Sequence, residues 1–296
     1  MTSQQEHAEH HEQRPSPRLA SLVDAVVGYR LTGFPAGVHI GMPSSTVTLV
    51  IPFDDGLTLS DPGRPVPHRF DSVLAGLATG PTRIHHDGNQ HGIQLALRPG
   101  AVRALFGVRA AELAEGSFEL QDVMGAGVAD LRDQLHETDS WSRRFDLVER
   151  SLLARLREPR APAPELAEAW RLIGASQGAA PIRDVAQVVG WSMRRLQQQF
   201  RAELGVTPKA AARVRRFERS VALVSSGRMP LTDVALRCGW SDHAHMNRDW
   251  RALAGTSPTR WRADFALGAL LPAPGACFSG PTWGRLKPVT GGGSGR

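Results

Sequence analysis

One face of a predicted helix carries side chains suited to reading DNA bases. Four of them stand at i, i+3, i+4 and i+7 and therefore share that face: Arg194, Gln197, Gln198 and Arg201. In the major groove arginine can form two hydrogen bonds with guanine, and glutamine or asparagine can form two with adenine. A face that is only solvated would more usually carry Glu and Lys, and this one has neither. We interpret it as a base-reading surface.

The segment that leads into this helix occurs twice in the chain. "DVAQVVGWS" at 184–192 matches "DVALRCGWS" at 233–241 with a constant offset of 49, and beyond the turn the offset becomes 50. In each copy a small Ala lets a second helix cross closely, Gly reverses the chain, and Trp fills the corner. Ser192 and Ser241 are suited to cap the helices that follow. The pattern predicts two helix-turn-helix units.

The offset of 50 carries the base-reading face onto the second copy. The matching positions there hold Ala244, Asn247, Arg248 and Arg251, with His243 beside them. Arg and Asn are again residues that pair with base edges. On the opposite side of the first helix an apolar stripe should face the core of the domain, and its members are Met193, Leu196 and Phe200.

The two units are separated by a segment that can act as a spacer. "PKAAARVRRFERSVALVSSG" contains roughly 17 helical residues, or about 25 Å of helix. Recognition helices in successive major grooves lie about 34 Å apart. Four arginines of the spacer could touch phosphate or be solvated, and the sequence leaves that choice open: Arg213, Arg215, Arg216 and Arg219.

Charge and composition limit the classes of function. Residues 1–165 carry 16 Arg against 21 Asp and Glu, a net of −5, whereas 166–265 carry 16 Lys and Arg against 8 acids, a net of +8. A basic segment of this kind favours a polyanionic partner. The two cysteines, Cys238 and Cys277, form neither a disulfide framework nor a metal motif. Apolar runs such as "VTLVIPF" are far too short to span a bilayer, so we expect a cytoplasmic protein without membrane contact.

The expected fold class is α+β, with a β-rich, cupin-like front domain followed by an all-α domain. Residues 1–18 are predicted to be a disordered tail, 19–158 a β-rich sensing and dimerisation domain that ends in helices, and 159–164 a linker. Residues 267–296 are predicted to be a flexible tail. Helices are expected at 165–174, 182–189, 193–203, 208–225, 231–238, 243–253 and 258–266.

The two "GWS" turns, together with "FRAELGVTP" and "GTSPTRWR", resemble the AraC/XylS family of bacterial transcription regulators. The resemblance covers about 165–265. It implies a seven-helix domain that inserts 193–203 and 243–253 into adjacent major grooves of promoter DNA, with no catalytic residue and no cofactor. It also implies RNA polymerase and a small-molecule effector as candidate partners, and location at the nucleoid.

Under this resemblance six residues occupy positions that contact bases in relatives: Arg194, Gln197, Gln198, His243, Asn247 and Arg248. Two departures from the family pattern weaken base recognition by the second helix, 243–253. Ala244 leaves only a contact with the thymine methyl group, and Asp249 is expected to place a negative charge near the interface. We therefore expect the second helix to bind DNA more weakly than the first.

Three other functions compete with this one. A metal-binding cupin could use His68, His85, His86 or His91, but His85 and His86 would face opposite ways along one strand. Methyl-transfer repair of DNA needs a Cys in the front half, and none precedes Cys238. A module that binds only proteins does not explain the base-reading face. The apolar stripe within 141–157, at Phe145, Val148, Leu152 and Leu156, suggests a homodimer.

Overall fold

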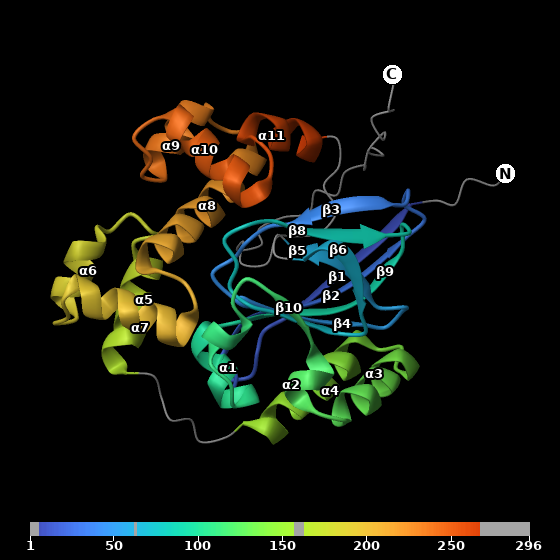
Figure 1. The fold of residues 1–296 in the computed structure, drawn as a ribbon. Helices are drawn as coiled ribbons and strands as arrows, with labels where there is room; N and C mark the ends of the chain where they lie inside the picture. The colour runs from blue at the N-terminus through green and yellow to red at the C-terminus, as the bar shows by residue number, and fades with distance from the viewer. Residues whose placement is uncertain (1–5, 62–63, 157–162, 267–296) are drawn as a thin grey trace.

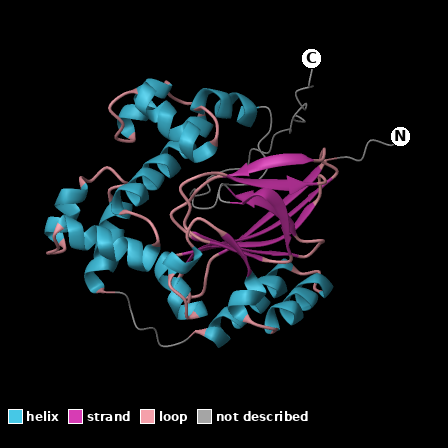
Figure 2. Ribbon diagram, in the orientation of Figure 1, coloured by secondary structure: helices cyan, strands magenta, loops and turns pink. Residues whose placement is uncertain are grey.

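The computed structural model describes residues 6–61, 64–156 and 163–266. Two sheets come first in the chain and helices follow, as Figures 1 and 2 show. The strands run as β1 (His7–Gln13), β2 (Val23–Thr32), β3 (Gly37–Gly41), β4 (Val47–Pro52), β5 (Leu57–Asp61), β6 (Arg64–Phe70), β7 (Val73–Ala75), β8 (Thr82–His86), β9 (Gln90–Leu97) and β10 (Ser117–Glu119). The α+β class predicted from the sequence is confirmed.

The strands form two antiparallel sheets. The six-stranded sheet has the order β1-β2-β9-β4-β7-β10, and the four-stranded sheet has the order β3-β8-β5-β6. Alternation along β4 shows how they are packed. Leu49 and Ile51 join the helices in one hydrophobic cluster, whereas Val50 points the other way and packs with Leu59 and Phe70 of the four-stranded sheet. One face of the six-stranded sheet is thus covered by helices and the other by the second sheet.

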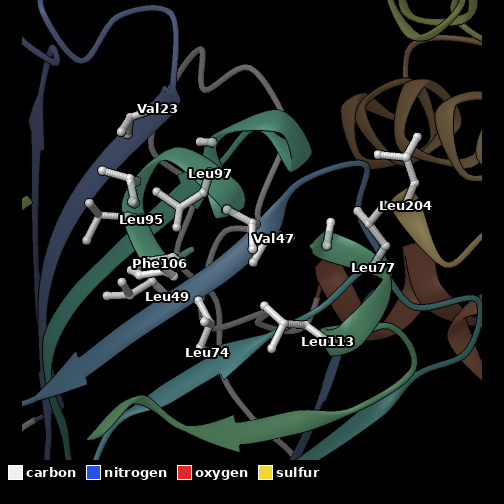
Figure 3. Packing of buried hydrophobic residues seen from close by; sticks show 14 of the residues in the cluster. Val23, Val47, Leu49, Leu74, Leu77, Leu95, Leu97, Phe106, Leu113 and Leu204 are labelled. Atoms are coloured by element: carbon white, nitrogen blue, oxygen red, sulfur yellow. The ribbon is translucent and has the colours of Figure 1, made fainter. Parts of the chain in front are cut away.

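Short helices complete the front domain, and Figure 1 shows α2, α3 and α4 together on one side of the strands. Their bounds are α1 (Pro99–Phe106), a 3₁₀ turn η1 (Ala110–Leu113), α2 (Leu120–Met124), α3 (Gly127–Glu137) and α4 (Trp141–Arg155). Figure 3 shows this core from close by, with Leu49, Leu95 and Phe106 inside it.

The helical domain contains α5 (Pro164–Ala175), α6 (Ile182–Val188), α7 (Met193–Leu204), α8 (Pro208–Ser226), α9 (Leu231–Arg237), α10 (His243–Ala254) and α11 (Pro258–Ala266). Each predicted helix is present with its ends within one residue of the expected ones. Gly205, Gly227 and Gly255 end α7, α8 and α10 in the left-handed conformation, which only glycine adopts without strain.

The prediction of a disordered tail at 1–18 is wrong for residues that the structure describes. Residues 7–13 form β1, which pairs with β2 from His7↔Thr32 to Gln13↔Val26. Backbone hydrogen bonds hold this edge strand, and they require no apolar side chain. His11 also stacks on Trp141, with ring centroids 4.9 Å apart. The predicted tail at 267–296, which includes Cys277, and most of the predicted linker lie outside the described residues.

The apolar stripe of α4 does not form a free surface. Phe145, Val148 and Leu152 are buried in the main cluster of their own chain. The feature that suggested a homodimer is therefore used to attach α4 to the six-stranded sheet.

Candidate nucleic-acid interface

The first helix-turn-helix unit consists of α6, a turn and α7. Val185 and Ala186 of α6 are buried, and Gly190 turns the chain with φ of +71°. The N–H of Trp191 then donates to the carbonyl of Ala186 at 2.9 Å, which closes the corner. Ser192 caps α7 as predicted, because its Oγ accepts a hydrogen bond from the N–H of Arg195 at 3.2 Å.

Helix α7 has one buried and one exposed face. Leu196, Phe200 and Leu204 are buried. The four side chains of the expected base-reading face are all exposed: Arg194, Gln197, Gln198 and Arg201. Met193 was expected to face the core, but 37% of it is exposed. It lies in the first turn of α7, beyond the point where the core reaches.

The second unit repeats the arrangement with α9 and α10. Val234 and Ala235 are buried, and the N–H of Trp240 donates to the carbonyl of Ala235 at 3.0 Å. Trp240 is more deeply buried than Trp191, with 2% exposed against 7%. Met246, Trp250 and Leu253 hold α10 to the core.

The cap of α10 is not the residue that the sequence predicted. Asp242 occupies the N-cap, and its carboxylate accepts a hydrogen bond from the N–H of His245 at 2.6 Å. Ser241 lies one residue earlier and donates its hydroxyl to Asp242 at 3.1 Å. The extra residue of the second turn therefore precedes the cap, so the offset of 50 already applies there and pairs Ser192 with Asp242. The N–H of His245 holds the pKa of the Asp242 carboxyl below its ordinary value.

The reading face of α10 is less open than that of α7. Ala244, Arg248 and Arg251 are exposed, but His243 and Asn247 are half-buried. The amide nitrogen of Asn247 lies 3.3 Å from a ring nitrogen of His243. These two side chains contact each other across one turn of the helix, whereas the corresponding positions of α7 are exposed.

Asp249 does not place a charge on the exposed face of α10, contrary to expectation. It is buried in the second unit, where Trp240 Nε1 donates to one carboxylate oxygen and Arg213 Nε to the other, both at 2.7 Å. A buried carboxylate requires such partners. Its charge stabilises the packing of α10 against α8 and leaves the exposed face of α10 positive.

Three of the four spacer arginines contact other residues of the chain, whereas the sequence suggested only phosphate or solvent as their surroundings. Arg213 pairs with Asp249, and Arg215 lies 3.6 Å from Glu218. Arg216 donates to the carbonyl of Gly239 at 3.2 Å and lies over the ring of Trp240. The first half of α8 packs in the main cluster and the second half in that of the second unit. In Figure 1, α6 and α7 lie toward one end of α8 and α9 and α10 toward the other.

The four histidines that could serve as metal ligands have other neighbours. His85 Nε2 lies 3.1 Å from Ser60 Oγ, His86 lies against His39, and His68 lies edge-on to Phe70. His91 lies 3.2 Å from Arg144, and burial together with this arginine lowers the pKa of His91 to about 4. Among the described residues, no three His, Cys, Asp or Glu side chains are grouped so as to hold a metal ion.

Cys238, the cysteine within the described residues, is buried at the end of α9. Burial raises the pKa of its thiol to about 11, which makes it a poor nucleophile. No helix in the described part of the chain is long and apolar enough to cross a membrane.

Known proteins share parts of this architecture. A helix-turn-helix domain family matches residues 185–264. The arabinose operon regulatory proteins of Salmonella typhimurium and Escherichia coli are each 33% identical to this chain over 82 residues. The matched segment covers 28% of this chain, 29% of the Salmonella protein and 28% of the Escherichia coli protein. The chain therefore carries, in its C-terminal half, an AraC-type helix-turn-helix domain. It spans less than a third of the length of these two regulators.

The front half has a match of its own, and a solved structure is similar to both halves. A family described as a domain of unknown function (DUF6597) matches residues 11–119. The crystal structure of ToxT from Vibrio cholerae O395 aligns with 87% of this chain over 97% of its own length, at 10% identity and a TM-score of 0.47.

Two contacts between the domains were not found from the sequence. Glu203 of α7 pairs with Arg103 of α1 at 2.7 Å, and Glu218 of α8 accepts hydrogen bonds from Ser45. Both contacts join residues at least 100 positions apart in the sequence, so no local sequence pattern predicts them. The Asp242 cap, in contrast, could have been found by applying the offset of 50 one residue earlier.

Proposed function

We propose that the chain is a sequence-specific transcription regulator that places α7 and α10 in adjacent major grooves of promoter DNA. One observation carries the proposal: the domain presents two helix-turn-helix units whose outer helices expose Arg and Gln on α7 and Arg on α10, with Asn247 half-buried beside them, while their apolar faces are buried. Arginine, glutamine and asparagine pair with base edges in the major groove.

The length of α8 supports simultaneous contact by both units. Its 19 residues span about 28 Å at about 1.5 Å per residue. That is close to the roughly 34 Å between successive major grooves on one side of DNA. The basic charge of 166–265 would contribute the part of the affinity that does not depend on sequence.

Selection of bound sequences from a random DNA pool tests this proposal. The wild-type chain should enrich a motif with two half-sites about one helical turn apart. The double variant Arg194→Ala/Gln197→Ala should lose the preference in one half-site and bind the motif at least tenfold more weakly, because each two-bond contact contributes about 1–3 kcal/mol.

A matched control separates base reading from general loss of charge. Arg150→Ala/Gln134→Ala removes the same two residue types from exposed positions of α4 and α3 and should leave the motif unchanged. An unaltered motif with Arg194→Ala/Gln197→Ala, or no enriched motif with the wild-type chain, would contradict the proposal.

The front domain is proposed to modulate DNA binding through a ligand. It contacts the helical domain at α7, where Arg103 pairs with Glu203, and at α8, where Ser45 meets Glu218. A change in the front domain can therefore reach both helices.

A further inference from the structure

An apolar side chain stands among the exposed polar ones at the amino end of α7. Met193 is the first residue of this helix, and 37% of it is exposed. Leu196 and Phe200, the other members of its apolar stripe, are fully buried. None of the hydrophobic clusters formed by the described residues includes Met193. It is therefore the member of the stripe that is available to contact another molecule.

Met193 borders the reading face of α7. It lies four residues before Gln197, and side chains at i and i+4 are neighbours on a helix. Arg194 follows it directly, and both Arg194 and Gln197 are exposed. In a helix-turn-helix domain the amino-terminal residues of the second helix reach the base edges. A helix that presents Arg194 and Gln197 to bases therefore brings Met193 into the same groove.

The second unit shows that the first position of an outer helix belongs to its reading face. With the offset of 50, Met193 corresponds to His243 and Gln197 to Asn247. In α10 these two side chains are in contact, since the amide nitrogen of Asn247 lies 3.3 Å from a ring nitrogen of His243. The same position is thus polar in α10 and apolar in α7.

The first turn of α7 is held in place, so Met193 has a defined position. Ser192 Oγ accepts a hydrogen bond from the N–H of Arg195 at 3.2 Å. The guanidinium of Arg195 lies over the ring of Trp191, 5.0 Å from its centroid, and Trp191 is buried. These contacts fix the backbone from which the Met193 side chain extends.

The major groove offers an apolar group that such a side chain can recognise. Thymine presents its 5-methyl group there, and apolar side chains recognise it by contact. Cytosine presents the same group when it is methylated at C5. The methionine side chain is unbranched and polarisable, so it can adapt to a methyl group. Arg194 and Gln197 are suited instead to guanine and adenine, so Met193 supplies a contact that these polar residues do not.

We propose that Met193 reads the 5-methyl group of a pyrimidine in the half-site that α7 occupies. The inference rests on the proposed function and deepens it, because the polar side chains of α7 select purines whereas Met193 selects a methylated pyrimidine. Burial of one such group changes an affinity about fourfold. The contact therefore sharpens the motif and is not required for its recognition.

Replacement of thymine by deoxyuridine tests the contact, because it removes only the methyl group. The half-site of α7 is the one whose preference is lost with Arg194→Ala/Gln197→Ala, and deoxyuridine is placed there at each thymine of either strand in turn. At one position the affinity of the wild-type chain should fall about fourfold. Met193→Ala should bind the two DNAs equally, and Met193→Leu, which keeps an apolar side chain, should retain the difference.

Cytosine and 5-methylcytosine at the same position separate the methyl group from the rest of the base. The wild-type chain should bind the methylated DNA about fourfold more tightly, and Met193→Ala should not distinguish the two. Equal binding of both DNAs by the wild-type chain would overturn the methyl group as the feature that is read.

Two controls accompany these measurements. Val188 is an apolar residue of α6 that is 67% exposed, and Val188→Ala should leave the methyl dependence unchanged. Deoxyuridine in the second half-site should affect the wild-type chain and Met193→Ala equally, because a methyl contact there would belong to Ala244.

The outcomes separate this inference from the proposed function. A methyl dependence that persists in Met193→Ala, or a first half-site in which no methyl group matters, would overturn the inference and leave the proposed function in place. A wild-type chain that selects no motif would overturn the proposed function and the inference with it.

Discussion

The two helix-turn-helix units have the same local plan but are supported differently. The first unit shares one hydrophobic cluster with the front domain, in which Leu204 of α7 lies with Leu77 and Leu113 (Figure 3). The second unit has a separate cluster built on Trp240 and Trp250, and the front domain contributes only Met42 to its buried part.

This difference shows that a repeated sequence need not give two equivalent elements. Helix α7 is held by the domain in which we propose a ligand acts, whereas α10 is held mainly by α8 and α9. The second unit compensates with larger aromatic side chains and with a buried carboxylate, Asp249. We therefore expect the first unit to respond to the front domain and the second to behave as a separate cooperative unit.

The largest effect is expected from Trp250→Ala. Trp250 is fully buried, and its Nε1 donates to Ser220 Oγ at 2.9 Å. Its loss should destabilise the second unit by about 3–5 kcal/mol. Hydrogen exchange should rise in α9 and α10 and stay unchanged in α6, α7 and the sheets. Phe200→Ala is the matched change in the first unit and should raise exchange into the front domain as well. Identical exchange patterns for the two variants would remove the distinction.

Two glycines that end the outer helices give the next comparison. Gly205 after α7 has φ of +75°, and a Cβ there would lie 2.2 Å from the Cβ of Ala114. Gly255 after α10 has φ of +68°, but the nearest atom to a Cβ, in Pro81, is 3.8 Å away. Gly255→Ala should cost about 1–2 kcal/mol from backbone strain alone. Gly205→Ala should cost about 1–3 kcal/mol more, because the contact with η1 must open.

Urea unfolding of both glycine variants checks this difference. Equal losses of stability would show that the contact between α7 and η1 is not tight.

A smaller effect is expected from Asp249→Ala, which acts on the second unit alone. The substitution leaves Trp240 Nε1 and Arg213 without their acceptor, and hydrogen bonds to charged groups contribute about 1.5–3 kcal/mol. Asp249→Asn keeps an acceptor for Trp240 and should lose less. Thermal unfolding measures both. A stabilised Asp249→Ala variant would show that the buried carboxylate does not support α10.

The smallest effect concerns Glu218, which lies in α8 beside the front domain. Burial raises the pKa of this carboxyl above its ordinary value of 4.5, with Arg215 and Ser45 opposing the shift. A raised pKa means that the folded state holds the proton more tightly. Its contribution to stability is therefore present below about pH 4.5 and is lost as the pH rises through the raised pKa.

Urea unfolding over a range of pH tests that sign. Glu218→Gln keeps an oxygen that can accept from Ser45 and has no charge to lose, so its stability should fall less than that of the wild type as the pH rises above 4.5. Parallel curves for the two proteins would contradict the assignment.

Local pattern predicted the helical domain well, because its signals are short-range. Glycines mark helix ends, the apolar period gives the buried face, and Ser192 caps α7 where its position suggested. The prediction that Met193 faces the core was wrong, because a periodic apolar stripe does not show where the core ends. The exposure of Arg194, Gln197, Gln198 and Arg201 followed from their spacing alone.

Interactions between distant segments could not be predicted in this way. The β1 strand lacks any apolar signal, and its pairing with β2 depends on backbone groups. Asp249 looked like a surface charge because Arg213 and Trp240, its partners, are 36 and 9 residues away. The docking of α7 on α1 arises only when the two domains are brought together.

The cap of α10 has a consequence for the counterions around the proposed complex. The amino end of a helix attracts phosphate through its exposed N–H groups. At α7 this end carries the neutral Ser192, whereas at α10 the Asp242 carboxylate already occupies it. The first half-site should therefore release more cations from DNA, and its occupancy should fall more steeply as salt is added. The difference in occupancy between the two half-sites should therefore depend on the ionic strength of the assay.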